Sequence, residues 1–229
     1  MVPVSLLRGI EPGARTGTSV GGQPVVVWRG QDGAVRAWAD RCPHRGMRLS
    51  FGFVRANALT CIYHGWSFGP DKDSTAEDGT AHGTARCLSV PAHPAMAPPA
   101  KAAVKPFPVA EALGMVWVGT GPDDTRPPDE GPDHLYPVRS VTVRAPAAAL
   151  CAALEESLPP GTQAAETSEA GGVVTFKGPA VRVIAAIQDR GDGASAAHVV
   201  TTDASPPARR ELCLWAALVR DHLAAVMLP

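Results

Sequence analysis

The sequence predicts a mainly β domain in the first half of the chain, followed by a small α+β domain. The 229 residues include 23 glycines and 23 prolines, whereas aromatic residues make up only 5%, which is typical of a turn-rich protein with short strands. The segment from Pro207 to Met227 carries apolar residues at spacings of three and four, which predicts a long amphipathic helix. This length fits one large domain or two small ones.

Turn residues separate the strand-like runs of the first half. A turn at Gln31-Asp32-Gly33 joins two of these runs and predicts a hairpin. The polar segment between Gly69 and Ala85 has no apolar period, so we expect an exposed and mobile loop there. The predicted strands are Gln23 to Trp28, Ala34 to Ala39, Val104 to Val109 and Met115 to Gly119.

A segment rich in Pro, Gly and acidic residues divides the chain. We expect a first domain over residues 1–119, a linker over 120–136 and a second domain over 137–229. Pro146 can occupy the first turn of a helix that ends at about Leu158, before Pro159-Pro160-Gly161. The other elements predicted before the last helix are strands at Arg139 to Val143, Gly172 to Lys177, Ala180 to Ile187 and Ala196 to Thr202.

Charge and hydropathy exclude several classes of function. The net charge is -1 and no long basic run occurs, so we expect neither nucleic-acid nor membrane binding. No apolar stretch reaches the roughly 18 residues that a membrane-spanning helix needs, and the first residues do not resemble a secretory signal. We therefore expect a cytoplasmic protein. Its five cysteines, an odd number, favour metal ligation or buried thiols over a disulfide framework.

Two short motifs supply a set of metal ligands. Cys42 and His44 form C-x-H, and Cys61 and His64 form C-x-x-H after sixteen intervening residues. Two tight turns that face one another can present two thiolates and two imidazoles to a common centre. The residues alone leave two interpretations open: a mixed-ligand iron–sulfur centre, or a structural zinc site with the same donors.

The residues around these motifs resemble the Rieske family, and within it the N-terminal domain of aromatic-ring and demethylating oxygenases. The matching stretches are CPHRGMRLSFG, CIYHGWSFG, CLSVPAHP and GMVWVGTG, over roughly residues 3–119. The resemblance implies a [2Fe-2S] cluster in which Cys42 and Cys61 bind one iron and His44 and His64 bind the other. Neutral imidazoles add less negative charge than thiolates and so raise the reduction potential above that of an all-cysteine cluster.

Three positions distinguish this sequence from respiratory Rieske proteins. Those proteins have an additional cysteine in each loop and a serine after the second histidine, whereas Met47, Tyr63 and Trp66 stand here. No disulfide can therefore join the loops. Without the serine hydroxyl fewer hydrogen bonds reach the sulfurs, which predicts a low, oxygenase-type potential.

The second half departs from the family pattern. Oxygenases of this type hold a mononuclear iron with two histidines and a carboxylate, but no histidine lies between His134 and His198. By position, Pro159 stands where an acid is expected, and Thr162 and Thr167 stand where histidines are expected. We therefore expect that the mononuclear iron is absent. The element order resembles a shortened helix-grip (START-like) domain.

Two of the remaining histidines could form an iron site in the second half, whereas the other histidines and cysteines are expected to have no catalytic role. His198 and His222 could converge with an acid chosen from Glu155, Glu156 and Asp221, although single histidines on such elements are more often surface or core residues. The remaining histidines, His82, His93 and His134, are expected to be solvated. The remaining cysteines, Cys87, Cys151 and Cys213, are expected to be packed thiols.

Three functions remain open. The first is an oxidoreductase component that relays electrons from a ferredoxin or flavin reductase to a mononuclear iron in a catalytic Rieske oxygenase subunit. The second is a self-sufficient Rieske monooxygenase with an atypical iron site in the C-terminal half. The third, from another class, is a non-redox ligand-binding protein with a structural metal. The family resemblance implies a trimer or a hetero-oligomer.

Overall fold

The computed structural model describes residues 1–70, 85–121, 124, 131–168 and 172–227, and it forms two compact units. The first unit comprises Met1, Arg8–Ala110 and Val118–Arg126. The second comprises Val2–Leu7, Glu111–Trp117 and Pro127–Pro229. Most of the predicted loop between Gly69 and Ala85 lies outside the described residues.

The first unit contains a four-stranded antiparallel sheet in the order β10-β4-β3-β2. The predicted hairpin forms between β3 and β4, where Val25 lies opposite Ala39 and Trp28 opposite Arg36. Trp28 and Trp38 pack edge to face in the core, with ring centroids 4.8 Å apart. The strands are β2 (Arg15–Val20), β3 (Gln23–Arg29), β4 (Val35–Ala39) and β10 (Pro106–Phe107).

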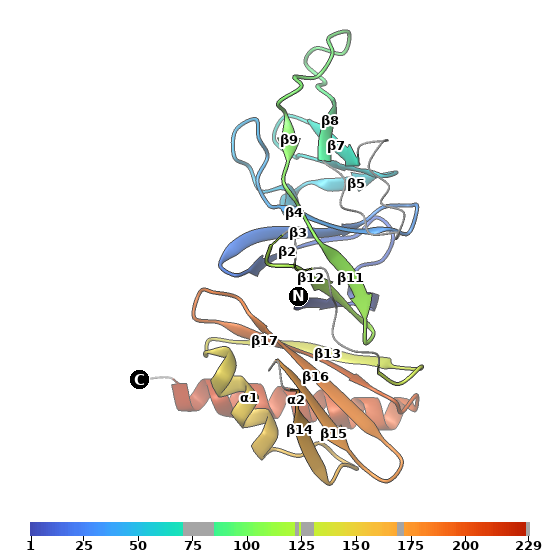
Figure 1. Ribbon diagram of the computed structural model, residues 1–229, viewed down its shortest axis with the longest axis vertical. Helices are drawn as coiled ribbons and strands as arrows, with labels where there is room; N and C mark the ends of the chain where they lie inside the picture. The colour runs from blue at the N-terminus through green and yellow to red at the C-terminus, as the bar shows by residue number, and fades with distance from the viewer. Residues whose placement is uncertain (71–84, 122–123, 125–130, 169–171, 228–229) are drawn as a thin grey trace. The chain divides into compact units, whose positions relative to one another are not determined.

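A five-stranded antiparallel sheet in the order β5-β6-β7-β8-β9 completes the first unit (Figure 1). Its strands are β5 (Phe53–Arg55), β6 (Ala58–Thr60), β7 (Ser67–Pro70), β8 (Ala85–Ser89) and β9 (Ala103–Val104). The single strand predicted at Val104 to Val109 is wrong. Pro106 and Pro108 lack the N–H that a continuous ladder needs, so the chain forms β9 in one sheet and β10 in the other.

Both sheets contribute to one hydrophobic core, which extends to the ends of β4 and β6. Leu49, in the short 3-10 helix η2 (Leu49–Phe51), Leu59 and Phe68 are fully buried there. The side chains of Cys42 and Cys61 belong to the same core. The fold therefore anchors the first residue of each metal-ligand motif inside the protein.

A three-stranded sheet, in the order β1-β12-β11, consists of β1 (Val2–Leu6), β11 (Val109–Ala112) and β12 (Met115–Val118). The 3-10 helix η1 (Leu7–Gly9) follows β1. Residues 2–7 and 111–117 belong to the second unit, whereas the sequence predicts a first domain over residues 1–119. The cause is packing, because β1 lies against the sheet of the second unit.

The second unit contains a five-stranded antiparallel sheet in the order β13-β17-β16-β15-β14. The sequence predicts four of these strands to within three residues at each end, but not the short edge strand β14. The predicted helix after Pro146 forms as α1 (Ala147–Glu156), and the last helix forms as α2 (Pro206–Met227). The strands are β13 (Tyr136–Val143), β14 (Ala164–Thr167), β15 (Val173–Lys177), β16 (Arg182–Asp189) and β17 (Ser195–Thr201).

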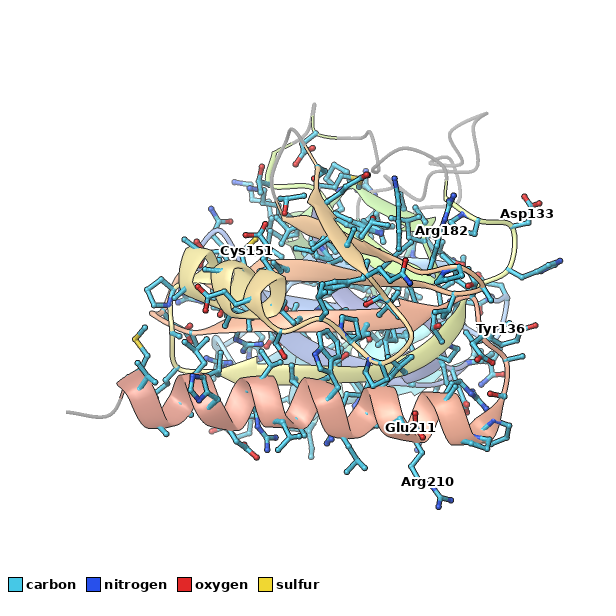
Figure 2. All side chains as sticks on the ribbon, turned by 90° about the horizontal axis from the view of Figure 1, so that it is seen from below. Asp133, Tyr136, Cys151, Arg182, Arg210 and Glu211 are labelled. Atoms are coloured by element: carbon cyan, nitrogen blue, oxygen red, sulfur yellow. The ribbon has the colours of Figure 1, made fainter. Side chains whose placement is uncertain are left out.

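Alternate residues of this sheet separate its two faces. Val183, Ala185 and Val199 pack in one core with side chains of α1 and α2, so their neighbours Ile184 and His198 point to the opposite face. Figure 2 shows α2 extending along the sheet. The mainly β first domain and the smaller α+β second domain are therefore confirmed.

Candidate metal centre

Two loops of the first unit have matching backbone hydrogen bonds. In the first loop, between β4 and η2, the Cys42 N–H donates to the Met47 carbonyl at 2.8 Å and the Gly46 N–H donates to the Cys42 carbonyl at 2.8 Å. In the second, between β6 and β7, the Cys61 N–H donates to the Trp66 carbonyl at 2.9 Å and the Gly65 N–H donates to the Cys61 carbonyl at 3.0 Å. The two motifs therefore adopt the same turn.

Glycine is needed at the fourth position after each cysteine. Gly46 and Gly65 have φ angles of +76° and +69°, in the left-handed region that other residues adopt only with strain. A Cβ at Gly65 would also lie 2.9 Å from Cγ of Pro91, which follows β8. Both motifs contain C-x-x-x-G, which is the signal of this shared turn in the sequence.

The four predicted ligands form two pairs. Cys42 and Cys61 are each 2% exposed, whereas His64 is exposed and His44 is half-buried. The two imidazole rings pack edge to face, with centroids 4.7 Å apart. The described residues contain no group of three or more His, Cys, Asp or Glu side chains placed around one ion position. A thiol pair inside and an imidazole pair outside fit a two-metal cluster with two ligands on each iron.

Burial controls the protonation of the donors. It raises the pKa of Cys42 to about 11, the neighbouring Cys61 adds to the rise, and the backbone N–H groups of His44 and Arg45 oppose it. Loss of solvent and the nearby His64 and Arg45 lower the pKa of His44. Metal binding here must displace the thiol protons, while the lowered pKa of His44 favours the neutral imidazole that binds metals.

Aromatic side chains flank the histidines. Trp66 stacks on His44 with ring centroids 4.4 Å apart and an interplanar angle of 4°, and the Tyr63 ring lies 3.9 Å from that of His64. The hydroxyl of Ser67 is hydrogen-bonded to that of Thr60 at 2.8 Å. The sequence alone does not predict the stacking of Trp66 on His44, because it does not show which ring the indole contacts.

Two buried cysteines and two histidines nearer the surface, on paired loops of a β domain, are the donors that a mixed Cys2His2 metal centre would use. A family model of the Rieske [2Fe-2S] domain matches residues 1–97. Oxidoreductase NdmD of Pseudomonas putida is 41% identical over 109 residues, which are 48% of this chain and 16% of NdmD. Protein TIC 55 of Arabidopsis thaliana, a chloroplastic protein, is 34% identical over 117 residues, 51% of this chain and 19% of that protein.

The likeness in structure extends further along the chain. The crystal structure of apo dicamba monooxygenase has a TM-score of 0.71 at 18% identity, and the match covers 98% of this chain and 84% of that one. Residues 1–97 therefore match the Rieske [2Fe-2S] domain, as the motifs predict, and the chain as a whole has the fold of dicamba monooxygenase. The chain spans less than a fifth of the length of NdmD and of TIC 55.

His198 and His222, the candidate ligands of an alternative iron site, are not brought together. His198 Nδ1 is hydrogen-bonded to the Ser140 hydroxyl at 2.8 Å, and its Nε2 lies 3.4 Å from Gln188 Oε1. Burial, with a contribution from Arg190, lowers the pKa of His198 to about 4. His222 lies on α2, on the other side of the sheet, in a groove of about 550 Å³ between the two helices. The structure therefore places His198 as a satisfied core histidine.

The three positions suggested for a lost iron site have other contacts. The Thr162 hydroxyl donates to the Pro159 carbonyl at 2.7 Å, where the chain turns after α1. The Thr167 hydroxyl, on β14, is hydrogen-bonded to a carboxylate oxygen of Glu155. His93 and His134 are exposed, and His82 lies outside the described residues.

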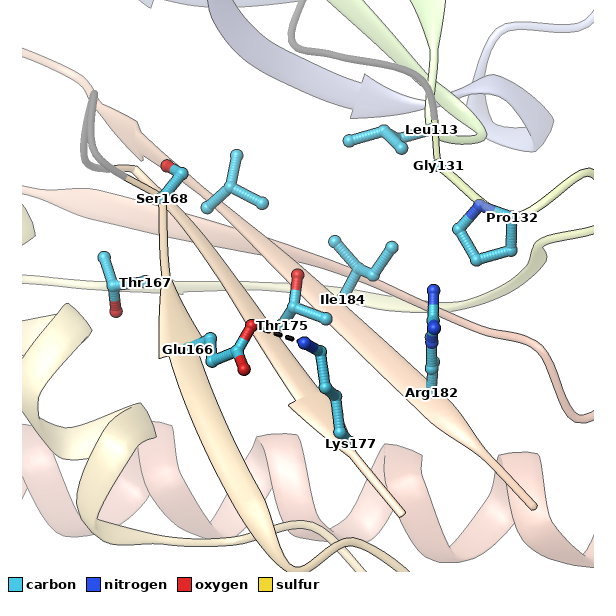
Figure 3. Close-up of a pocket in the computed structure, with 11 residues that line it drawn as sticks. Leu113, Gly131, Pro132, Glu166, Thr167, Ser168, Thr175, Lys177, Arg182 and Ile184 are labelled. Carbon is cyan, nitrogen blue, oxygen red and sulfur yellow. Dashed lines mark hydrogen bonds and ion pairs between the residues drawn. The ribbon is translucent and has the colours of Figure 1, made fainter. Parts of the chain in front are cut away.

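A cavity of about 340 Å³ lies on the face of the second-unit sheet that points away from the helices (Figure 3). Leu113, Ile184 and Arg182 line it, and Lys177 pairs with Glu166 at 2.5 Å. Both of these charged side chains are largely exposed, at 45% and 61%. This hollow is separate from the helix-facing side of the sheet, which is filled by the hydrophobic core.

No helix in the described part of the chain is long and apolar enough to cross a membrane.

Proposed function

We propose that this chain is an electron-relay component of a Rieske oxygenase system, with Cys42, His44, Cys61 and His64 as the ligands of its [2Fe-2S] cluster. The observation that carries the proposal is the division of the donors into a buried thiol pair and an outward imidazole pair on matching turns. The cluster supplies reversible one-electron chemistry when it is bound.

The chain's own residues set the conditions for that chemistry. The core of the first unit surrounds the two cysteines and excludes water from the sulfur side. The N–H groups of His44 and Arg45 stabilise negative charge on the Cys42 sulfur. The exposed His64 makes the imidazole side the accessible one. Electrons are therefore proposed to enter and leave across the histidines.

We propose further that the oxygen-activating iron lies in another polypeptide. The absence of a histidine between His134 and His198 supports this, as do the local hydrogen bonds of Thr162 and Thr167. The opposite placement of His198 and His222 argues against the self-sufficient monooxygenase. The proposed donor is a ferredoxin or a flavin reductase, and the proposed acceptor is a catalytic Rieske oxygenase subunit in a trimeric or mixed assembly. We also propose cytoplasmic residence, which the unpaired cysteines support.

An anaerobic reductive titration of the iron-loaded chain tests the proposal. We expect one electron taken up per chain, a Rieske-type EPR signal, and no high-spin iron–nitrosyl signal after nitric oxide is added. The variant Thr162→Ala should keep the same electron uptake. A second electron taken up by an iron that is lost in His198→Ala or His222→Ala would contradict the relay.

The midpoint potential tests the surroundings of the cluster. With Ser67 bound to Thr60 and Trp66 in place of a serine, few hydroxyl hydrogen bonds are available to the sulfurs. We therefore expect a potential in the lower part of the Rieske range, which extends from about −150 to +300 mV. A value well above about +100 mV would contradict this expectation.

A further inference from the structure

Exposed side chains of two loops lie near the proposed metal centre. Arg41, Arg45 and Arg48 are exposed on the loop that carries His44, and Ile62 and Tyr63 are exposed beside His64. We call these five residues, together with His64, the histidine face. Arg41 Nε lies only 3.5 Å from the position that a Cβ on Gly46 would occupy, and the Tyr63 ring lies 3.9 Å from the His64 ring. Arg41 and Tyr63 therefore lie against the two turns that carry the proposed ligands, and the other exposed residues are their neighbours on the same loops.

Positive charge is concentrated in this half of the first unit. The described residues 41–70 and 85–110 contain seven Lys or Arg and no Asp or Glu, and all seven are exposed. They are Arg41, Arg45, Arg48, Arg55, Arg86, Lys101 and Lys105. The intervening segment 71–84, with its four acids and one lysine, lies outside the described residues. The net charge of -1 for the whole chain therefore conceals a one-sided distribution.

The three arginines of the histidine face are available to a partner. In the part of the chain that the structure describes, none of them forms an ion pair. The nearest preceding acid, Asp40, is 3% exposed and accepts hydrogen bonds from the backbone and hydroxyl of Ser50. Arginine is more weakly hydrated than lysine and pairs well with carboxylates, so it is favoured at protein interfaces.

The centre of the histidine face is apolar. Ile62 is 59% exposed and Tyr63 is 54% exposed, directly before His64. A single exposed apolar residue needs no explanation. An adjacent aliphatic and aromatic pair beside unpaired arginines has the composition of a protein interface, in which aromatic and arginine side chains carry much of the binding energy.

We propose that the histidine face is the docking surface for an acidic one-electron carrier protein. Carboxylates of the carrier lie opposite Arg41, Arg45 and Arg48, and its redox centre lies over Ile62, Tyr63 and His64. The reduced carrier loses one electron and is thereby oxidised, and this chain gains that electron and is reduced. This inference rests on the proposed relay function, and it selects an acidic carrier over a donor that lacks surface charge.

A stopped-flow experiment with a plant-type ferredoxin, which is strongly acidic, as the reduced donor tests the proposal. Electrostatic steering accelerates association by about 10 to 10³-fold and is screened by salt. We therefore expect the second-order rate constant to fall at least about tenfold between low and high ionic strength. We expect a similar loss at low salt in the double variant Arg45→Glu/Arg48→Glu. Rates independent of salt and of both substitutions would overturn the proposal.

Two further variants keep the test specific. Arg144→Glu/Arg210→Glu changes the net charge equally at exposed sites of the second unit and should leave the rate constant within about twofold of the parent. If Arg45→Glu/Arg48→Glu fails to fold, the milder Arg45→Gln/Arg48→Gln should give an intermediate loss. An equal loss in the second-unit variant would show a general charge effect and would contradict docking at the histidine face.

With a cationic donor, the substitutions should change the reduction rate in the opposite direction. One-electron-reduced methyl viologen is positively charged, so the arginines should repel it, and Arg45→Glu/Arg48→Glu should raise its rate of reduction of the chain. A fall in both rates would overturn the charge argument. Salt-sensitive retention of a DNA duplex by the same arginines, with no effect on ferredoxin, would also overturn it. If dithionite produces no reduced-cluster EPR signal in the parent, the proposed function itself fails; a normal signal with uniform rates rejects only the docking surface.

Discussion

The two units use their polar side chains in opposite ways. In the first unit the imidazoles of His44 and His64 lie at the surface beside unpaired arginines, and no acid occurs in the described residues 41–70 and 85–110. In the second unit the described residues 131–168 and 172–227 carry nine acids and eight Lys or Arg, and His198 is buried with Ser140 and Gln188 as neighbours. A histidine that can bind a metal or a partner must keep a ring nitrogen accessible, and His198 does not.

The largest expected effect comes from removing one outward imidazole. His64→Ala leaves one iron with a single protein ligand in the proposed cluster, so we expect loss of the visible absorbance and of bound iron and sulfide. His93→Ala is the matched control, because His93 is an exposed histidine of the same unit outside the paired loops. Iron and sulfide assays on both variants check this. Full cluster content in His64→Ala would remove that ligand from the assignment.

A core substitution in the second unit should act on stability alone. Trp215 is 6% exposed, packs edge to face on Phe176 at 5.5 Å, and donates from Nε1 to the Ser157 carbonyl at 2.8 Å. Trp215→Ala should lower the free energy of unfolding of this unit by about 3–5 kcal/mol. Urea unfolding followed by circular dichroism measures the loss. A cluster spectrum that disappeared under native conditions would contradict the separate roles of the two units.

The buried His198 predicts a pH dependence of the second unit. Its pKa is lowered to about 4, below the value of about 6.5 in an unfolded chain, so the unfolded state binds the proton first as pH falls. The stability of this unit should therefore be full above about pH 6.5 and decline toward pH 4, by about 2 kcal/mol at pH 5. Urea unfolding at pH 7 and pH 5 tests this in the parent and in His198→Gln, where the difference should shrink.

The smallest predicted effect is a difference in stability between variants of the two loop glycines. Gly65→Ala and Gly46→Ala share the cost of a left-handed backbone, about 1–2 kcal/mol, but only the Gly65 position meets Pro91, at 2.9 Å. At Gly46 the nearest atom is 3.5 Å away. Gly65→Ala should therefore be the less stable variant in thermal unfolding of the first unit. Equal losses of stability in the two variants would mean that Pro91 moves away from the new Cβ at no cost in free energy.

Local patterns predicted much of this molecule. The C-x-H and C-x-x-H motifs identified the two loops because each ligand pair is contiguous in sequence, and the spacing of apolar residues predicted α2 nearly to the residue. The contacts that the sequence did not predict are between distant segments. Examples are β1 against the sheet of the second unit, β14 as its edge strand, and the stacking of Trp66 on His44.

The distribution of charge in the first unit is a second feature that the sequence did not predict. A net charge averages over the whole chain, and the value of -1 led to the expectation of no charged footprint. The absence of acids over residues 41–70 is visible in the printed sequence, but whether the basic residues there lie at one surface depends on the fold. Only the structure places Arg41 near Gly46 and shows that Arg45 and Arg48 are exposed on the loop that carries His44.

The central claim is that two thiolates and two imidazoles hold a paired iron–sulfide unit and that the second unit adds no further iron. Quantitative analysis of iron, zinc and acid-labile sulfide in the purified chain tests it most directly. We expect two irons and two sulfides per chain, in the same ratio in the parent and in His198→Ala. One zinc without sulfide would contradict the first part of the claim, and a third iron that depends on His198 or His222 would contradict the second.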